Sequence, residues 1–198
     1  MPNDRRYRVP GGTYFFTVVT HRRRRFLTGE LARRCLREAI DTVRAKRPFE
    51  MPAMILLPEH LHAIWELPRG DADYSVRWKR IKEEFTIAWL AGGGTEAPLS
   101  ASRGKRKERG VWQRRFWEHL IEDEHDFERH FDYIHYNAVR HGEVDCPKHW
   151  PCSSFHRWVQ RGVYEPDWGC SRYEPLSFDD LDETAMEYEV QDVWQRDP

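Results

Sequence analysis

The sequence predicts an α+β domain: a ferredoxin-like split βαβ fold with an antiparallel four- to five-stranded sheet, helices on one face and a C-terminal extension. Two observations predict this class. Runs of β-branched and aromatic residues alternate with segments whose apolar residues recur every three or four positions. The resulting order is strand, helix, strand, strand, helix, strand, helix, and its first six elements match the split βαβ order. The second sheet face is then free to carry a site.

The composition describes one polar domain with a real core. The chain has 198 residues, of which 39% are hydrophobic and 33% charged. Its first residues show no secretory signal, and no window approaches the roughly 20 apolar residues of a membrane helix. We therefore expect no membrane partner and a cytoplasmic location.

Charge divides the chain into a basic body and an acidic tail. Residues 164–198 hold 11 Asp/Glu and 2 Lys/Arg, whereas residues 1–163 hold 22 acids and 30 bases. We expect one domain over residues 1–160 and an acidic tail over residues 161–198. A basic body favours an anionic partner, nucleic acid first, although the tail could simply solubilise the chain.

The four cysteines are irregularly spaced, and none forms a CxxC pair. This spacing favours neither a disulfide framework nor a structural zinc site, although Cys146, His149 and Cys152 are close enough in sequence to keep a zinc site open. The cysteines are Cys35, Cys146, Cys152 and Cys170.

The first strand is predicted over residues 14–20, where aromatic and β-branched residues follow two glycines. Four arginines come directly after it and cannot be buried unpaired, so they form a solvated turn or contact phosphates. Together with the other basic clusters, they favour phosphate contact. They are Arg22, Arg23, Arg24 and Arg25.

The middle of the chain reads as helix, hairpin, helix. Apolar spacing predicts a helix over residues 30–46, which Pro48 ends. Strands over residues 49–57 and 60–67 are so close that they should form a hairpin. Ser75 is a candidate N-cap for a helix that runs to about Ala91.

The last core elements follow a basic loop over residues 95–110, for which DNA contact and no role at all both remain open. A fourth strand is predicted over residues 111–121, where aromatics and arginines interleave. A final helix is predicted over residues 124–140, capped by Asp123 and stopped by Gly142.

Four residues suggest a reactive site. Tyr133 and Asn137 are four apart and share a helix face, while His60 and His62 are two apart and share a strand face. We hypothesise that the two faces meet, so that both imidazoles and the Asn137 oxygen hold a divalent cation beside the Tyr133 hydroxyl. Each motif alone is more often structural: a His-x-His on a strand, or a core tyrosine. Tyr136 is the rival nucleophile.

Three blocks of sequence resemble the REP-associated tyrosine transposases, relatives of the single-strand transposases of the HUH endonuclease superfamily. The resemblance covers roughly residues 7–160. One departure is Ala138, where that family usually has proline. The blocks are Leu57-Pro58-Glu59-His60-Leu61-His62, Trp112-Gln113-Arg114-Arg115-Phe116-Trp117-Glu118-His119 and residues 133–142 with Tyr133 and Asn137.

The resemblance implies a metal-dependent DNA endonuclease and strand transferase. Tyr133 would be the nucleophile that forms a covalent 5′-phosphotyrosine, and His60, His62 and Asn137 would bind Mg²⁺ or Mn²⁺. The substrate would be single-stranded DNA beside hairpins in a bacterial nucleoid. Whether the protein is a monomer or a homodimer stays open. Candidate backbone contacts are Arg22, Arg23, Arg24, Arg25, Arg114 and Arg115.

Two other readings compete with this one. A domesticated DNA-hairpin binding protein without chemistry is the main alternative, and the intact residues at all four site positions count against it. A replication initiator or relaxase uses the same chemistry, but here the tyrosine follows the His pair and no helicase-like segment comes after it. A further hypothesis is that residues 174–198 fold over the basic groove and compete with DNA.

Overall fold

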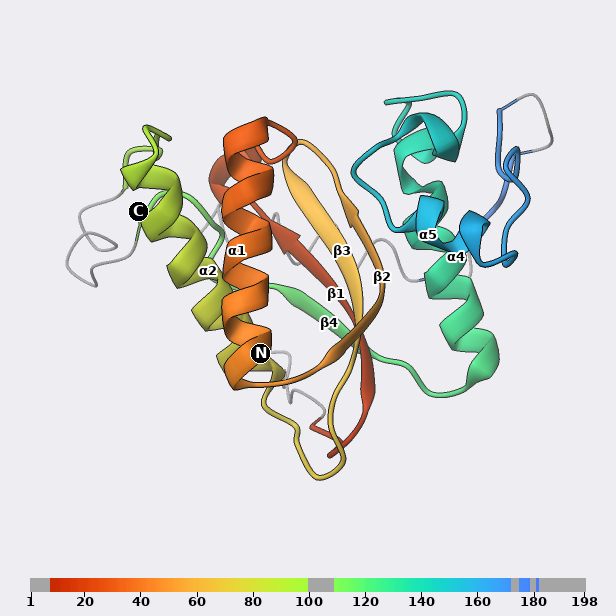
Figure 1. The fold of residues 1–198 in the computed structure, drawn as a ribbon, viewed down its shortest axis with the longest axis horizontal. Helices are drawn as coiled ribbons and strands as arrows, with labels where there is room; N and C mark the ends of the chain where they lie inside the picture. Colours follow the sequence, from red (N-terminus) through yellow and green to blue (C-terminus); the bar gives the residue numbers. More distant parts are fainter. Residues whose placement is uncertain (1–7, 100–108, 172–174, 179–180, 182–198) are drawn as a thin grey trace, which may run out of the picture.

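The computed structural model describes residues 8–99, 109–171, 175–178 and 181 (Figure 1). Residues 100–108 and most of residues 174–198 lie outside this range, as do the expectations for the basic loop and for most of the acidic tail. Within the described residues, no helix is both long and apolar enough to span a bilayer.

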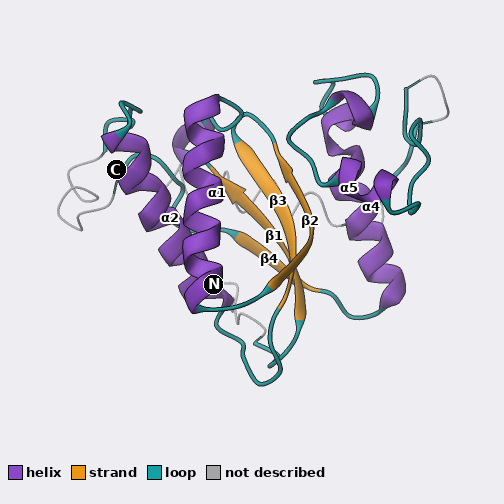
Figure 2. Ribbon diagram, in the orientation of Figure 1, coloured by secondary structure: helices purple, strands orange, loops and turns teal. Residues whose placement is uncertain are grey.

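Four antiparallel strands form one sheet in the order β2-β3-β1-β4 (Figure 2). This is the strand order of a ferredoxin-like fold, so the predicted class is confirmed. Strand β1 (Thr13–Val19) lies in the centre and pairs with both β3 (His60–Glu66) and β4 (Trp117–Leu120). Strand β2 (Glu50–Leu56) pairs with β3, as the predicted hairpin requires.

Two long helices begin and end where the sequence predicts. Helix α1 spans Glu30–Lys46, and helix α4 spans Glu124–Arg140. The Asp123 carboxylate accepts a hydrogen bond from the Asp126 N–H at 2.8 Å, which satisfies one free amide at the start of α4. Helix α2 spans Tyr74–Ala91 and has Asp73, not the predicted Ser75, at its N-cap position.

The fourth strand is shorter than predicted. Instead of residues 111–121, only Trp117–Leu120 pair with β1, and Trp112 forms a single bridge with Thr20. Arg114 and Arg115 lie exposed between these two pairings. Aromatic and arginine residues in alternation have strand propensity, but they extend a strand only where a partner continues beside them.

Helices cover both faces of the sheet, not one as predicted (Figure 1). Helices α1 and α2 cover the face formed by Tyr14, Phe16 and Val18. On this face Trp65 stacks on Trp78, with ring centroids 4.2 Å apart. Helix α4 packs against the opposite face, over β2 and β3. The face that was expected to be free for a site is therefore the one on which the tyrosine helix sits.

The chain after α4 folds back beside that helix and along the edge of β2. It forms η2 (Pro147–His149) and α5 (Phe155–Gln160), and the Leu56 N–H donates to the Cys152 carbonyl at 2.8 Å. A disulfide joins Cys146 to Cys170, which corrects the expectation of no disulfide. Sequence spacing could not indicate this pair, because the fold-back of residues 161–171 brings it together.

Candidate active site

Strand β3 presents His60 and His62 on the face toward α4, because residues two apart share a face while Leu61 and Ala63 enter the other core. Both histidines are buried, and their ring centroids lie 4.8 Å apart. The pair is therefore held by a central strand and shielded from bulk water.

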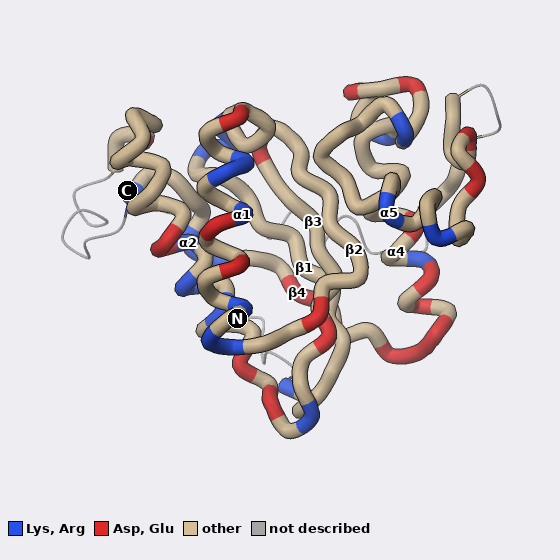
Figure 3. The backbone as a smooth tube through the Cα atoms, in the orientation of Figure 1, with Lys and Arg blue, Asp and Glu red and all other residues tan. Residues whose placement is uncertain are grey.

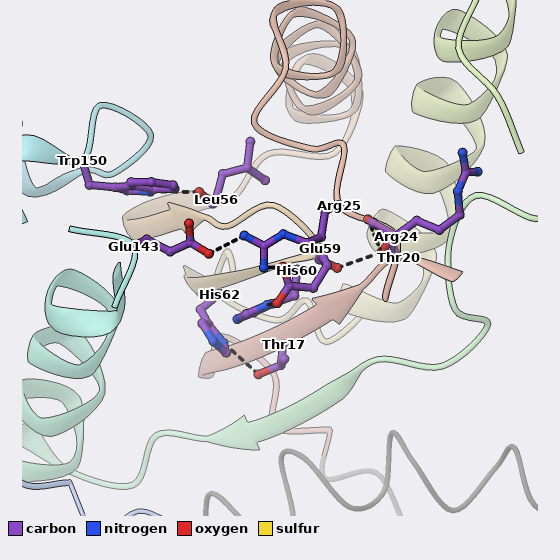
Figure 4. A network of polar contacts seen from close by, with 10 residues as sticks. All are labelled: Thr17, Thr20, Arg24, Arg25, Leu56, Glu59, His60, His62, Glu143 and Trp150. Carbon is purple, nitrogen blue, oxygen red and sulfur yellow. Dashed lines mark hydrogen bonds and ion pairs between the residues drawn. The ribbon is translucent and has the colours of Figure 1, made fainter. Parts of the chain in front are cut away.

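Each imidazole of the pair has a partner on its Nδ1 atom. His60 Nδ1 lies 3.2 Å from Glu59 Oε1, and His62 Nδ1 lies 2.9 Å from Thr17 Oγ1 (Figure 4). A proton on each Nδ1 leaves the Nε2 lone pair free to bind a metal, as carboxylate and hydroxyl partners do around metal-bound histidines. His62 Nε2 is buried and has no hydrogen-bond partner.

Tyr133 reaches the same place from α4. Its ring centroid lies 5.3 Å from that of His62 and 5.9 Å from that of Phe15. The structure thus brings the predicted nucleophile and one predicted ligand into contact within one chain. The rival Tyr136 instead packs against Trp168 and Phe178 from the C-terminal fold-back.

Asn137 follows Tyr133 by one turn on the same helix face and is fully buried. Neither its amide oxygen nor its amide nitrogen has a hydrogen-bond partner. Buried amides almost always have partners, and exceptions call for a bound water or ion. Together with His62 Nε2, the Asn137 oxygen supplies the kind of orphaned donor atom that a metal site requires.

Positive groups surround these ligand atoms. Burial lowers the pKa of His62 well below its ordinary value, and the charges of His60, His141, Arg140 and Arg23 lower it further. His62 is therefore neutral at neutral pH, as a metal ligand must be. The Arg140 guanidinium lies 5.7 Å from the Tyr133 ring centroid, so the approach to the tyrosine suits an anion.

A carboxylate stands beside the pair. The hydrogen bond from His60 lowers the pKa of Glu59, so this group stays ionised. Arg25 bridges Glu59 and Glu143, with Nη1–Oε2 and Nη2–Oε1 distances of 3.5 Å and 2.6 Å (Figure 4). No sequence motif singles out Glu143.

The six predicted DNA-contacting arginines are not equivalent. Arg25 is held by two carboxylates, and Arg24 donates to Thr95 O and Oγ1 at 2.9 Å and 2.6 Å. Arg22 and Arg23 form the turn η1 (His21–Arg23) with positive φ angles of 57° and 48°. The remaining two, Arg114 and Arg115, are exposed before β4.

Two further features near the site are not predicted from the sequence. Thr17 pairs with His62 in the β1–β3 register, and its signal was a polar residue among aromatic and β-branched neighbours. His119, Asp126 and His130 form a group that could hold a metal, with one ligand atom from each all within 4.8 Å of one another. It is the one such group of His, Cys, Asp and Glu side chains within the part of the chain that the structure describes.

The C-terminal segment covers the tyrosine. Phe178 is buried, its ring centroid lies 5.5 Å from that of Tyr133, and the neighbouring Ser177 carbonyl accepts from Arg129 Nη2 at 2.8 Å. A segment expected to be an acidic tail thus contributes an apolar contact at the proposed nucleophile.

Comparisons with known proteins support one family. No family model matches the chain. The REP-associated tyrosine transposase of Escherichia coli K12 is 44% identical over 169 residues, which cover 85% of this chain and 91% of that protein. A Haemophilus influenzae protein, given the same family name provisionally, is 41% identical over 175 residues, 85% of this chain and 94% of its own.

A solved structure agrees with these relatives. A REP-associated tyrosine transposase bound to a REP hairpin superposes with a TM-score of 0.70 at 43% identity, and the match covers 85% of this chain and 91% of that one. With identities above 40% across most of both chains, this protein belongs to the REP-associated tyrosine transposases.

Proposed function

We propose that this protein is a metal-dependent single-strand DNA endonuclease and strand transferase that acts at hairpin-forming repeats through Tyr133. One observation carries the proposal. The Tyr133 ring lies beside His62, whose Nε2 is buried without a partner, and the Asn137 amide one turn away is orphaned as well. Such unmade bonds cost free energy in the protein alone, and a bound ligand would supply them.

The proposed metal ligands are His60, His62 and the Asn137 oxygen. Two imidazoles and one amide oxygen fit Mn²⁺ at least as well as Mg²⁺, because Mg²⁺ prefers oxygen ligands. When bound, the ion would polarise the scissile phosphate and offset its charge. Glu59 and Thr17 would fix the orientation of the two rings through their Nδ1 atoms.

The chemistry is a transesterification at phosphorus. The Tyr133 oxygen bonds to the 5′-phosphate while the bond from phosphorus to the upstream 3′ oxygen breaks. The phenol proton passes to water, and the released 3′ oxygen takes up a proton. The covalent 5′-phosphotyrosine keeps the bond energy, so a 3′-hydroxyl of another strand can later displace Tyr133 without a nucleotide cofactor. Such transfer depends on positioning and charge stabilisation more than on covalent chemistry.

The proposed substrate is single-stranded DNA beside a hairpin, since a solved relative holds a REP hairpin. Arg22, Arg23, Arg114 and Arg115 are the proposed backbone contacts, and Arg140 would face the scissile phosphate. Arg24 and Arg25 must first leave their present partners to contact DNA. Tyr133 already lies against His62 of its own chain, so we propose cleavage by a monomer acting on DNA in the bacterial cell.

The test is incubation of the protein with an end-labelled REP-type hairpin oligonucleotide and Mn²⁺, followed by a denaturing gel. We expect a nicked strand and a protein–DNA adduct with wild type, and neither with Tyr133→Phe, which should still bind the hairpin. Tyr136→Phe is the matched control, because it removes a hydroxyl from the same helix, and it should form the adduct. An adduct with Tyr133→Phe would overturn the nucleophile assignment.

The alternative function is hairpin binding without chemistry. It predicts that wild type with Mn²⁺ gives neither nick nor adduct while binding the hairpin. A tyrosine blocked by Phe178 would also give neither nick nor adduct. The assay is therefore repeated with Phe178→Ala, which lacks this contact.

A further inference from the structure

A second cluster of metal-binding side chains lies where β4 meets α4. His119 Nε2 lies 2.8 Å from Asp126 Oδ2, and His130 Nδ1 lies 2.8 Å from Asp126 Oδ1. The two imidazole rings stack with centroids 4.6 Å apart at an interplanar angle of 18°. Each histidine therefore turns one nitrogen toward a different oxygen of the same carboxylate.

The donor set and its exposure fit a metal ion with one open position. Asp126 and His130 are four apart on α4 and share a face, and His119 approaches from the neighbouring strand. The His130 side chain is 3% exposed, whereas those of His119 and Asp126 are 34% and 19% exposed. Protein closes one side of the cluster, and water can reach the other as a fourth ligand.

The surrounding charge favours a cation. Glu122 and Asp123 lie in the turn that leads into α4, and Glu124 is the first residue of this helix, so acidic residues gather there (Figure 3). This setting is opposite to that of His62, whose charged neighbours include Arg140 and Arg23. A free divalent ion thus meets an attractive field at the β4–α4 junction, while the proposed catalytic site also attracts phosphate.

We propose that His119, Asp126 and His130 form a second metal site, separate from His60, His62 and Asn137, that binds Zn²⁺ with water as the fourth ligand. Two imidazoles and one carboxylate around an open position are a zinc donor set, and the hard ion Mg²⁺ is disfavoured by the two nitrogens. The competing arrangement is a His–Asp–His hydrogen-bonded tie without metal, and the experiment below separates the two.

The second site would fix the start of α4 on the sheet. The ring centroid of Phe15 in β1 lies 4.8 Å from that of His130, 5.3 Å from that of His62 and 5.9 Å from that of Tyr133. A metal that ties His119 of β4 to His130 of α4 therefore holds the helix one turn before Tyr133. The ion would act by holding the helix in place, and its occupancy does not depend on the proposed cleavage reaction.

The test measures metal binding to a His60→Ala/His62→Ala variant of the full chain, in which the proposed catalytic site is removed. The probe is Co²⁺ added alone, followed by Zn²⁺. We expect one equivalent of bound Co²⁺ with the visible absorption of a four-coordinate site, stoichiometric displacement by Zn²⁺ and a Zn²⁺-dependent rise in Tm. Further substitution by His119→Gln should abolish all three results.

His125→Gln in the same background is the matched control, because His125 is exposed in the same helix turn and should leave metal binding unchanged. Far-UV circular dichroism checks that each variant is folded. If the folded double variant binds no Co²⁺ or Zn²⁺ at micromolar concentrations, or if binding survives His119→Gln, the second site does not exist and the cluster is a hydrogen-bonded tie. Loss of cleavage activity alone would affect only the proposed function.

Discussion

Two sets of buried polar side chains lie at helix α4, and the sets differ in whether their hydrogen bonds are made. On one side, His135 Nε2 lies 2.8 Å from Ser154 Oγ and His135 Nδ1 lies 3.1 Å from the Tyr164 hydroxyl, which donates to Asp132 Oδ1 at 2.5 Å. On the other side, toward the sheet, Asn137 and His62 Nε2 have no partner.

We interpret this difference as separating polar groups that stabilise the fold from those of the proposed metal site. The chain from Ser154 to Asp132 anchors the C-terminal fold-back to α4 and leaves no atom of His135 for a ligand. The same helix keeps Asn137 desolvated with all of its amide hydrogen bonds unmade. A protein tolerates that cost where binding recovers it, which is why we place the metal beside Asn137 and not beside His135.

The largest effect on cleavage should come from replacing a buried side chain whose hydrogen bonds are unmade. Asn137→Leu should lower the single-turnover cleavage rate in Mn²⁺ by about 100-fold or more, because one ligand is lost. The free energy of unfolding should stay level or rise by about 1 kcal/mol, since a buried amide without partners is removed. The measurements are adduct formation over time and urea unfolding. A destabilisation of about 2 kcal/mol would mean that Asn137 has partners in the protein.

Replacing a side chain whose hydrogen bonds are made should have the opposite pattern, with lower stability and nearly unchanged cleavage. Tyr164→Phe leaves His135 and Asp132 without their common partner and should destabilise the protein by about 1–3 kcal/mol. Cleavage by the folded variant should stay within about twofold of wild type, because the network lies on the side of α4 away from the His pair. A loss of cleavage comparable to that of Asn137→Leu would show that the two sets act as one.

The pH dependence of stability sharpens the same contrast. Burial lowers the pKa of His135 from 6.5 to about 3. Between these pH values the unfolded chain binds a proton on this imidazole and the folded protein does not. The stability from this group is full above pH 6.5 and is lost as the pH falls toward 3. By pH 5 the loss should reach about 2 kcal/mol, at about 1.4 kcal/mol per pH unit.

His135→Gln isolates this contribution. The difference in unfolding free energy between wild type and His135→Gln should shrink as the pH falls from 7 to 5, measured by urea unfolding at each pH. The buried His62 and His130, whose pKa values burial also lowers, act in the same direction but are common to both proteins. A difference that does not change with pH would contradict a neutral, buried His135.

The smallest effect concerns the segment over Tyr133. Phe178→Ala should raise the cleavage rate by a few-fold, because it removes the ring that lies 5.5 Å from the Tyr133 ring. Truncation after Tyr173 removes this contact and the acidic residues together, and it should also raise DNA affinity. The gain in DNA affinity that comes from removing acidic residues should fade above about 0.5 M salt, because charges are then screened within a few ångströms. The gain in cleavage rate that comes from removing Phe178 should remain. No change with either variant would remove the idea of an inhibitory tail.

Local sequence signals were enough to predict the fold but not every contact at the site. Periodicity and the Asp123 cap placed α4 at residues 124–140, and strand alternation placed His60 and His62 on one face. Strand β4 was overestimated because propensity does not reveal where a partner strand ends. The covering of Tyr133 by Phe178 and the Cys146–Cys170 disulfide depend on a fold-back of the chain that no local pattern encodes.

The same limit applies to the second cluster. Asp126 and His130 show the i, i+4 spacing of a helix, which is visible in the sequence. His119 joins them only because a short turn brings the end of β4 beside the first turn of α4. His119 and Asp126 are seven positions apart with a turn between them, and no sequence pattern predicts contact at that separation. Only the structure shows this group.

The pairing of Thr17 with His62 in the β1–β3 ladder has a consequence for how this protein can evolve. Because neighbouring residues of a strand point to opposite faces, sliding β3 by one position would bury both imidazoles under α1 and α2 and expose Leu61 and Ala63 to the tyrosine helix. An insertion or deletion within β3 would thus disrupt both hydrophobic packing and the proposed DNA-cleavage site in one event. A variant that keeps the packing of β3 therefore keeps the relative positions of the proposed site residues, so single substitutions at these side chains are the simplest way to lose the proposed activity.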